Sequence, residues 1–144
     1  MRDDNNQLNN NVVDAELFER LMICGATNLH ANIEEVNNLN VFPVPDGDTG
    51  TNMVHTFTGG LAAVSVQQHV GQYMKDLARA VLLSARGNSG VIFSQFIRGL
   101  YRGFEQKETV CFADFAQAFT CAREDAYRSI ITPTEGTILT VISE

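Results

Sequence analysis

Apolar residues recur every three or four positions along most of this chain, and this spacing constrains the fold more than any other feature. It is typical of helices that bury one face. The sequence shows no sustained alternation of apolar and polar residues, which a half-buried strand would require. We therefore predict an all-α fold. The expected helices cover residues 14–28, with Asp14 as the N-cap, a short stretch from 32 that frays through Asn37 and Asn38, and then 51–66, 71–85, 91–100, 112–131 and 138–144. Their apolar stripes, which include Phe112 and Phe119, are expected to form the core. Gly59 and Gly60 should weaken or kink their helix, or allow another element to approach closely.

The length of 144 residues is enough for one domain with a buried core. Residues 1–12 are rich in asparagine and are expected to form a disordered tail, so that residues 13–144 make up the domain. The final helix would have only about two turns before Glu144, where a helix normally continues further. We therefore expect the domain to be cut short before its last helix.

Charge and composition exclude several classes of protein. The net charge is −7, with basic residues scattered along the chain, so a nucleic-acid partner is not expected. No apolar run approaches the ~20 residues of a membrane span, and the polar start does not resemble a signal peptide. Three widely spaced cysteines, Cys24, Cys111 and Cys121, are typical of a reduced compartment and are expected to be buried. These features predict a cytoplasmic protein.

Residues 40–52 read Asn-Val-Phe-Pro-Val-Pro-Asp-Gly-Asp-Thr-Gly-Thr-Asn. The prolines fix the backbone and lack N–H donors, so the chain should arrive here extended. The glycine between Asp46 and Asp48 allows a tight turn in which both carboxylates converge. Converging carboxylates repel each other, and a divalent cation such as Mg²⁺ or Ca²⁺ is the usual remedy. The turn is therefore a candidate metal site.

Side chains suited to phosphate follow this turn, at Thr49, Thr51 and Asn52, where a helix is expected to begin. The alternative is a plain turn with an N-cap, because Asp-Gly and Asp-Thr-Gly are common in both. An EF-hand is excluded: counted from Asp46, the position of the bidentate glutamate is occupied by Phe57.

A second loop, Arg-Gly-Asn-Ser-Gly, precedes another apolar helix. Free N–H groups at a helix start, together with the helix dipole, favour an anion. Gly87 and Gly90 would let a phosphate approach the backbone, Asn88 and Ser89 add donors, and Arg86 adds positive charge. The alternative is an interhelical turn with Asn88 or Ser89 as the N-cap.

The third loop, Thr134-Glu135-Gly136-Thr137, has the same character, and its alternative is again a plain capped helix start. All three loops lie at junctions between predicted helices. In an up-and-down arrangement these junctions would gather at one end of the molecule, where helix N-termini would form a pocket for metal and phosphate.

With these motifs the chain resembles the nucleotide-binding domain of the dihydroxyacetone kinase L-subunit (DhaL) family, and more closely the N-terminal kinase domain of bacterial fatty acid kinases. The resemblance rests on residues 40–53, on Ser-Ala-Arg-Gly-Asn-Ser-Gly-Val-Ile-Phe-Ser-Gln at 84–95, and on Pro-Thr-Glu-Gly-Thr-Ile-Leu-Thr-Val at 133–141. It implies a barrel of antiparallel helices that binds a nucleotide at one rim.

By motif, the resemblance implies that Asp46 and Asp48 are the catalytic residues, which hold Mg²⁺ against the phosphates of ATP or ADP. Asn40 would be a third metal-site residue, by its oxygen or through water. The residues expected near the nucleotide are Thr49, Thr51, Asn52, Arg86, Gly87, Asn88, Ser89, Gly90, Thr134, Glu135, Gly136 and Thr137.

The implied reaction is phosphoryl transfer from ATP to the carboxylate of a fatty acid, which a separate, DegV-like fatty-acid-binding protein presents to the full-length chain. Such a carboxylate is already ionised at pH 7, so no general base is required. The alternatives are a glycerone (dihydroxyacetone) kinase domain, a regulatory nucleotide-binding module without turnover, and a Mg²⁺-dependent phosphohydrolase. An incomplete barrel would also be expected to dimerise and cover its apolar surface.

Overall fold

The structure, a computed structural model, describes residues 12–41 and 44–144. Within them there are seven helices and no strand, which confirms the predicted all-α class. An isolated antiparallel bridge joins Val13 and Val110. The predicted tail lies outside the described residues except for Val12. The helices are α1 (Ala15–Ala31), α2 (Ile33–Leu39), α3 (Thr49–Ala62), α4 (Val70–Leu83), α5 (Gly87–Phe104), α6 (Phe112–Arg128) and α7 (Ile138–Ser143).

Most helix positions agree with the sequence pattern, and the ends differ for local reasons. Asp14 is the predicted N-cap of α1, and its Oδ1 accepts a hydrogen bond from the Leu17 amide at 2.9 Å. The third helix ends at Ala62 rather than Val66, because the Ala63 amide turns back to the Gly60 carbonyl at 3.2 Å. Helix α6 ends three residues before the predicted limit at 131.

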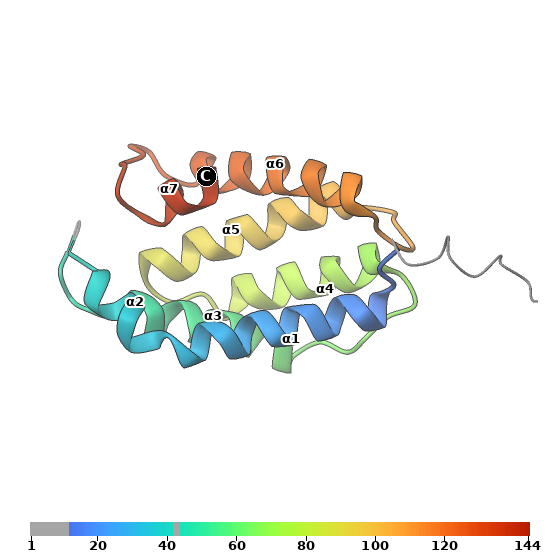
Figure 1. Cartoon of the computed structure of the whole chain (residues 1–144), viewed down its shortest axis with the longest axis horizontal. Helices are drawn as coiled ribbons and strands as arrows, with labels where there is room; N and C mark the ends of the chain where they lie inside the picture. Colours follow the sequence, from blue (N-terminus) through green and yellow to red (C-terminus); the bar gives the residue numbers. More distant parts are fainter. Residues whose placement is uncertain (1–11, 42–43) are drawn as a thin grey trace, which may run out of the picture.

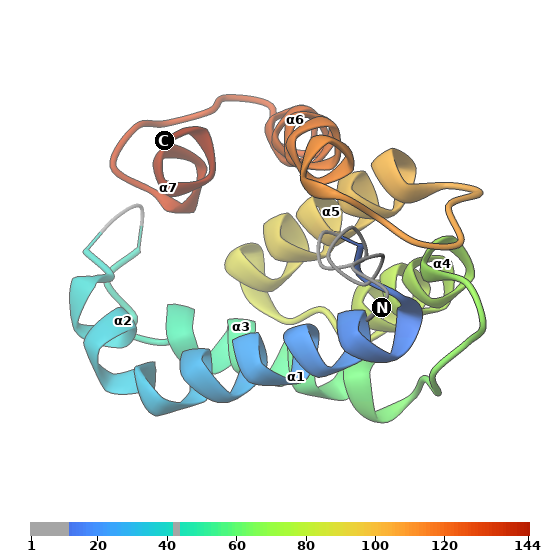
Figure 2. The ribbon, with the colours of Figure 1, turned by 45° about the vertical axis from the view of Figure 1, so that its right-hand side comes forward.

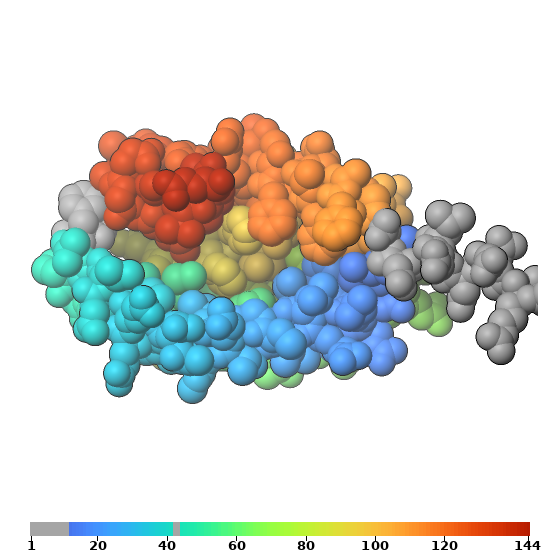
Figure 3. All heavy atoms as spheres, viewed as in Figure 1, coloured from blue at the N-terminus to red at the C-terminus, as the bar shows by residue number. Residues whose placement is uncertain are grey.

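The helices form an open arc (Figures 1 and 2). Helix α1 packs against α3 and α4, and these two pack against α5. Helix α5 packs against α6, and α7 contacts α6. In the space-filling view a hollow runs between α1 on one side and α6 with α7 on the other, and atoms of α5 are visible at its floor (Figure 3). The N-terminal ends of α3 and α5 lie at the end of the molecule that carries α2 (Figure 1).

The core is built around interlocking aromatic rings from four helices. The Phe18 ring centroid lies 5.4 Å from that of Phe104 and 6.3 Å from that of Tyr73, in both cases edge to face. Phe115 stacks on Phe18 with centroids 5.9 Å apart. Phe18, Tyr73 and Phe104 are fully buried, so this cluster ties α1, α4, α5 and α6 together.

Helix α5 packs backbone to backbone against α6 through two glycines. A Cβ on Gly99 would lie 2.4 Å from the Ala122 Cα, and one on Gly103 would lie 2.3 Å from the Ala118 Cα. Both alanines are completely buried. Because the small residues of α6 face α5, two aromatic residues of α6 that were expected in the core are exposed, Phe112 by 80% and Phe119 by 52%.

The glycine pair inside α3 also has a packing role. A Cβ on Gly60 would lie 2.3 Å from Val81 Cγ2, and one on Gly59 would lie 2.8 Å from the Ser84 hydroxyl, so the pair admits the end of α4. This confirms the expectation that the pair allows a close approach. The prediction that the cysteines are buried is wrong for Cys24, which is exposed on α1, and Cys111 and Cys121 are only half-buried.

Across residues 12–41 and 44–144, every helix is too short or too polar to span a bilayer.

Candidate functional site

The acidic turn joins α2 to α3 and is held by its own residues. Gly47, between the two aspartates, has a φ of +66°, the left-handed region that favours glycine. The Asn40 side-chain amide at the end of α2 donates a hydrogen bond to Asp46 Oδ1 at 2.8 Å. Asp48 follows directly as the N-cap residue of α3. The structure thus brings Asn40 and Asp46 into contact, as their predicted membership of one site requires.

The side chain of Asp48 is not used to cap α3, because it makes no capping hydrogen bond within the described residues. Asn37 of α2 takes this role: its Oδ1 accepts from the Thr51 amide at 3.2 Å, and its Nδ2 donates to the Thr51 hydroxyl at 3.0 Å. Gly50 admits α2 here, since a Cβ would lie 2.8 Å from the Ile33 carbonyl oxygen. The plain N-cap alternative requires the Asp48 carboxylate to cap α3, and the described part of the structure does not show this hydrogen bond.

The second loop has a different start from the one its alternative interpretation predicts. Arg86 is the N-cap residue of α5, and Asn88 and Ser89 already lie in the first helical turn, so neither is the N-cap. Arg86 makes no side-chain capping bond in the described part of the chain. Gly87 has a φ of +63°. The first amide groups of α5 are thus left without a side-chain cap, a state that suits an anion.

The first and second loops meet through side chains of α3. A Cβ on Gly87 would lie only 2.6 Å from Asn52 Nδ2, and one on Gly90 only 2.4 Å from the Thr56 hydroxyl. The Arg86 amide donates to that hydroxyl at 3.1 Å. The starts of α3 and α5 are therefore neighbours, as the predicted common pocket requires.

The third loop is placed less directly. Figures 1 and 2 show it at the same end of the molecule as the loop between α2 and α3. Its hydrogen bonds are internal: the Thr137 hydroxyl donates to the Thr134 carbonyl at 2.8 Å, and the Thr140 hydroxyl donates to Glu135 Oε2 at 2.7 Å. The Gly136 amide donates to the Thr140 hydroxyl at 2.9 Å. Its assignment to the nucleotide stays a prediction.

The donor set at the acidic turn suits a metal that is completed by other oxygens. The described ranges contain no group of three His, Cys, Asp or Glu side chains arranged to hold a metal. Two carboxylates with an amide nearby are typical of Mg²⁺, which keeps several waters and takes its remaining ligands from substrate phosphates. The residues present therefore fit a Mg²⁺-nucleotide better than a metal held by protein groups alone.

Two residues with a structural part in this site were not found by sequence reasoning, Asn37 and Thr56. At Asn37 the sequence pattern indicates only a fraying helix end. Thr56 lies beside the apolar stripe of α3. It is completely buried in the structure, and a buried hydroxyl requires a polar partner. In both cases the partner is distant in sequence, by 14 residues for Asn37 and by 30 for Thr56.

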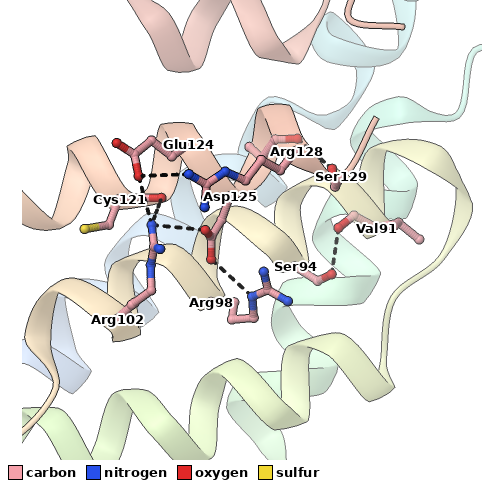
Figure 4. A network of polar contacts seen from close by, with 10 residues as sticks. Val91, Ser94, Arg98, Arg102, Cys121, Glu124, Asp125, Arg128 and Ser129 are labelled. Carbon is pink, nitrogen blue, oxygen red and sulfur yellow. Dashed lines mark hydrogen bonds and ion pairs between the residues drawn. The ribbon is translucent and has the colours of Figure 1, made fainter. Parts of the chain in front are cut away.

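A second polar cluster joins α5 to α6 (Figure 4). The Asp125 side chain is only 3% exposed, and its two oxygens lie 3.1 Å from Arg98 Nε and 3.1 Å from an Arg102 nitrogen. Arg102 also pairs with Glu124 at 3.1 Å. Shallow depressions of about 450 and 370 Å³ flank Arg128 beside this cluster. Neither depression is lined by residues of the three loops. The ion pairs connect α5 to α6, so the cluster is a clamp between these two helices.

Comparison with known proteins agrees with this fold and these motifs. The DAK2 domain family matches residues 43–144. An uncharacterized protein of Staphylococcus saprophyticus is 47% identical over 131 residues, which is 90% of this chain and 24% of the relative. Uncharacterized proteins of Staphylococcus epidermidis and Staphylococcus aureus are 43% and 42% identical over 134 residues, each covering 92% of this chain and 24% of the relative.

The chain thus spans about a quarter of the length of the curated relatives that it matches. The family match covers the acidic turn from residue 43 onward, the Arg86–Gly90 loop and the loop before α7. The all-α architecture of the chain is consistent with a DhaL-like helical bundle. The chain belongs to the DAK2 domain family, a family of DhaL-like, ATP-binding kinase modules.

Proposed function

We propose that this domain binds a Mg²⁺-nucleotide and supplies the ATP site of a kinase. One observation carries the proposal: the starts of α3 and α5 lie against each other through Asn52 and Gly87, beside the turn that carries Asp46 and Asp48. Each helix start offers free amide groups and the positive end of a dipole, both of which attract phosphate. Family membership supports the same function.

The roles of the residues follow from their positions. Asp46 and Asp48 would hold Mg²⁺, with Asn40 orienting Asp46 through the amide that it already donates. When bound, the ion neutralises charge on the phosphate oxygens. The first-turn groups of α3 (Thr49, Thr51, Asn52) and of α5 (Gly87, Asn88, Ser89, Gly90) would bind phosphate, with Arg86 adding charge and residues 134–137 lying near the nucleotide.

For the acceptor we propose a fatty acid carboxylate, presented by a DegV-like fatty-acid-binding protein to the full-length chain. A carboxylate oxygen would attack the γ-phosphorus, and the bond from that phosphorus to the β,γ-bridging oxygen would break, giving an acyl-phosphate and ADP. The acceptor is already ionised at pH 7, so positioning and charge neutralisation are sufficient. This fits a turn in which Asp48 is followed by Thr49 rather than by a base.

A binding measurement tests the site. Calorimetry of ADP with Mg²⁺ and with excess EDTA should show nucleotide binding that depends on the metal. Asp46→Asn and Asp48→Asn should each abolish that dependence while circular dichroism shows unchanged helicity. Glu34→Gln, which removes an equal charge from an exposed position on α2, is the control and should bind normally. Equal affinity with and without metal in the unaltered protein would contradict the assignment of the two aspartates.

A turnover measurement separates the acceptors. The full-length protein is supplied with ATP and Mg²⁺ together with a fatty acid and its carrier, with dihydroxyacetone, or with no acceptor. Hydroxamate formed on adding hydroxylamine supports acyl-phosphate production, because acyl-phosphates react with that nucleophile. Phosphorylated dihydroxyacetone would support the glycerone kinase alternative, and phosphate release without acceptor would support a phosphohydrolase. Nucleotide binding without turnover in any arm would support a regulatory module.

We further propose that the protein acts in the cytoplasm and that exposed apolar residues are covered by association with a second copy. The three free cysteines fit a reduced compartment. Phe112 and Val141 are 80% and 75% exposed. Covering large apolar side chains with another molecule removes them from water, which favours association. Sedimentation analysis tests the dimer, and Phe112→Asp should shift any dimer toward monomer.

A further inference from the structure

Thr56 is a completely buried polar residue in the second turn of α3. Its hydroxyl donates a hydrogen bond to the Asn52 carbonyl at 2.7 Å and accepts one from the Arg86 amide at 3.1 Å. A hydroxyl has one proton to donate and lone pairs to accept with, so both functions are used at once. The side chain therefore joins the helix that follows the acidic turn to the first residue of the second loop.

The contact with the second loop continues beyond Arg86. The Gly90 amide donates to the Arg86 carbonyl at 3.1 Å and so forms the first turn of α5. A Cβ on Gly90 would lie 2.4 Å from the Thr56 hydroxyl and 3.6 Å from the Asn52 carbonyl oxygen. The first turn of α5 thus contacts this hydroxyl directly through Gly90, while Gly87 contacts the Asn52 side chain.

Thr58 shows what an ordinary threonine in the same helix does. Its hydroxyl donates to the carbonyl four residues back, that of Val54, at the same distance of 2.7 Å. Thr58 is exposed, however, and its hydroxyl makes no second hydrogen bond within the described residues. The bond within the helix is thus common to both residues, and the bond to another element distinguishes Thr56.

We propose that Thr56 is a positioning residue of the nucleotide site: its hydroxyl holds the start of α5 against the start of α3, so that their amide groups bind the phosphates as one surface. This rests on the proposed function. Thr56 would not touch the nucleotide itself, because it is buried beneath Asn52 and Gly90. Its effect is to align groups that bind phosphate only when both helix starts are correctly placed.

The test compares Thr56→Val, which keeps the branched shape and removes the hydroxyl, with Thr56→Ser, which keeps the hydroxyl. Calorimetry of Mg²⁺-ADP binding should show affinity reduced about tenfold in the valine variant and within about twofold of the unaltered protein in the serine variant. Thr58→Val is the matched control and should also stay within about twofold. Amide exchange at Arg86, followed by NMR, should be faster in Thr56→Val alone.

Gly90 approaches the same contact from α5 and covers the case in which Thr56→Val does not fold. Gly90→Ala should weaken Mg²⁺-ADP binding strongly in the unaltered protein, because the new methyl group meets the hydroxyl. In a Thr56→Ala background the same change should cause a clearly smaller further loss, since the oxygen is gone and the remaining neighbours lie at 3.5 and 3.6 Å. Such non-additivity is the sign of direct contact.

The outcomes separate this inference from the proposed function. If the unaltered protein binds no Mg²⁺-ADP, the proposed function fails and this inference fails with it. If the unaltered protein binds Mg²⁺-ADP but Thr56→Val binds equally well, or Thr56→Ser loses as much affinity as Thr56→Val, the positioning role alone is overturned. Additive effects of the Gly90 and Thr56 changes would overturn it as well.

Discussion

Gly87 lies directly against the side chain of Asn52, so closely that a Cβ on Gly87 would be 2.6 Å from Asn52 Nδ2. The two residues lie in the first turns of different helices and are 35 positions apart in the sequence. Their contact brings the second loop onto the first, and the candidate phosphate site depends on it. The backbone of residue 87 can approach the Asn52 side chain this closely only because residue 87 has no side chain.

Gly87→Ala should therefore lower both stability and Mg²⁺-ADP affinity. Gly136→Ala is the matched comparison for stability, because both glycines have positive φ, +63° and +78°, while Gly136 has no heavy atom of the described residues within 4 Å of its would-be Cβ. Each change costs about 1 kcal/mol for the backbone. Urea denaturation should show a larger loss for Gly87→Ala, and equal losses would contradict the clash with Asn52.

Asn37→Ala should destabilise the start of α3. Both functions of the Asn37 amide are used on Thr51, so alanine removes the cap that Asp48 does not supply. The expected loss in the free energy of unfolding is about 1 kcal/mol, measured by urea denaturation. Asn38→Ala, at the exposed neighbouring position, gains the same helix propensity and should stay within about 0.5 kcal/mol. If both variants behave alike, the cap is not at Asn37.

Asp125→Asn should release the clamp between α5 and α6 (Figure 4). The buried carboxylate pairs with Arg98 and Arg102, and its loss leaves two cations without their shared partner. We expect a loss of about 2 kcal/mol in the free energy of unfolding, less than for fully buried pairs because both arginines reach solvent. Glu124→Gln neutralises the adjacent, 45% exposed carboxylate and should cost under about 1 kcal/mol. A larger effect at Glu124 would contradict this order.

Tyr73 makes stability sensitive to alkaline pH. Burial, with a smaller contribution from the Glu19 charge, raises the pKa of the Tyr73 phenol from 10.0 to about 12. Between these values the unfolded chain releases the proton and the folded chain keeps it, so the contribution of Tyr73 to stability is constant below pH 10 and is lost as pH rises toward 12. The expected slope from this group is about 1.4 kcal/mol per pH unit.

Tyr73→Phe should remove that slope. The Tyr73 hydroxyl is buried without a hydrogen-bond partner among the described residues, so phenylalanine should also stabilise the fold by about 1 kcal/mol at neutral pH. Urea denaturation of both proteins from pH 7 to 11.5 measures both effects. A difference between the two proteins that does not change with pH would show that the phenol ionises normally in the folded state.

Local signals in the sequence were sufficient to locate the helices and to name candidate residues in the first two loops, whose roles stay predictions. Asp14 could be identified as a cap because its partner, the Leu17 amide, is only three residues away. The Gly59–Gly60 pair indicated a close approach, although the partner, the end of α4, was not specified. The fold class followed from spacing alone, since a 3.6-residue period needs no knowledge of the partner face.

Two differences between expectation and structure arise where the deciding partner lies far away in the sequence. Asn88 and Ser89 are good N-cap residues by type, yet α5 begins earlier because Arg86 is held by Thr56. Phe112 and Phe119 fit the apolar stripe of α6, but α6 is turned by the contact of its alanines with Gly99 and Gly103. Residue type alone does not distinguish these outcomes.

The amino-acid sequence by itself determined the helices, the acidic turn and the glycines that make close contacts possible, because each depends on neighbours within a few residues. Only the tertiary structure decided that the starts of α3 and α5 meet, that Asn37 caps α3 in place of the Asp48 side chain, and that Thr56 joins the two loops. These outcomes depend on packing between segments whose relative position is set by the whole core, and a linear pattern does not contain that position.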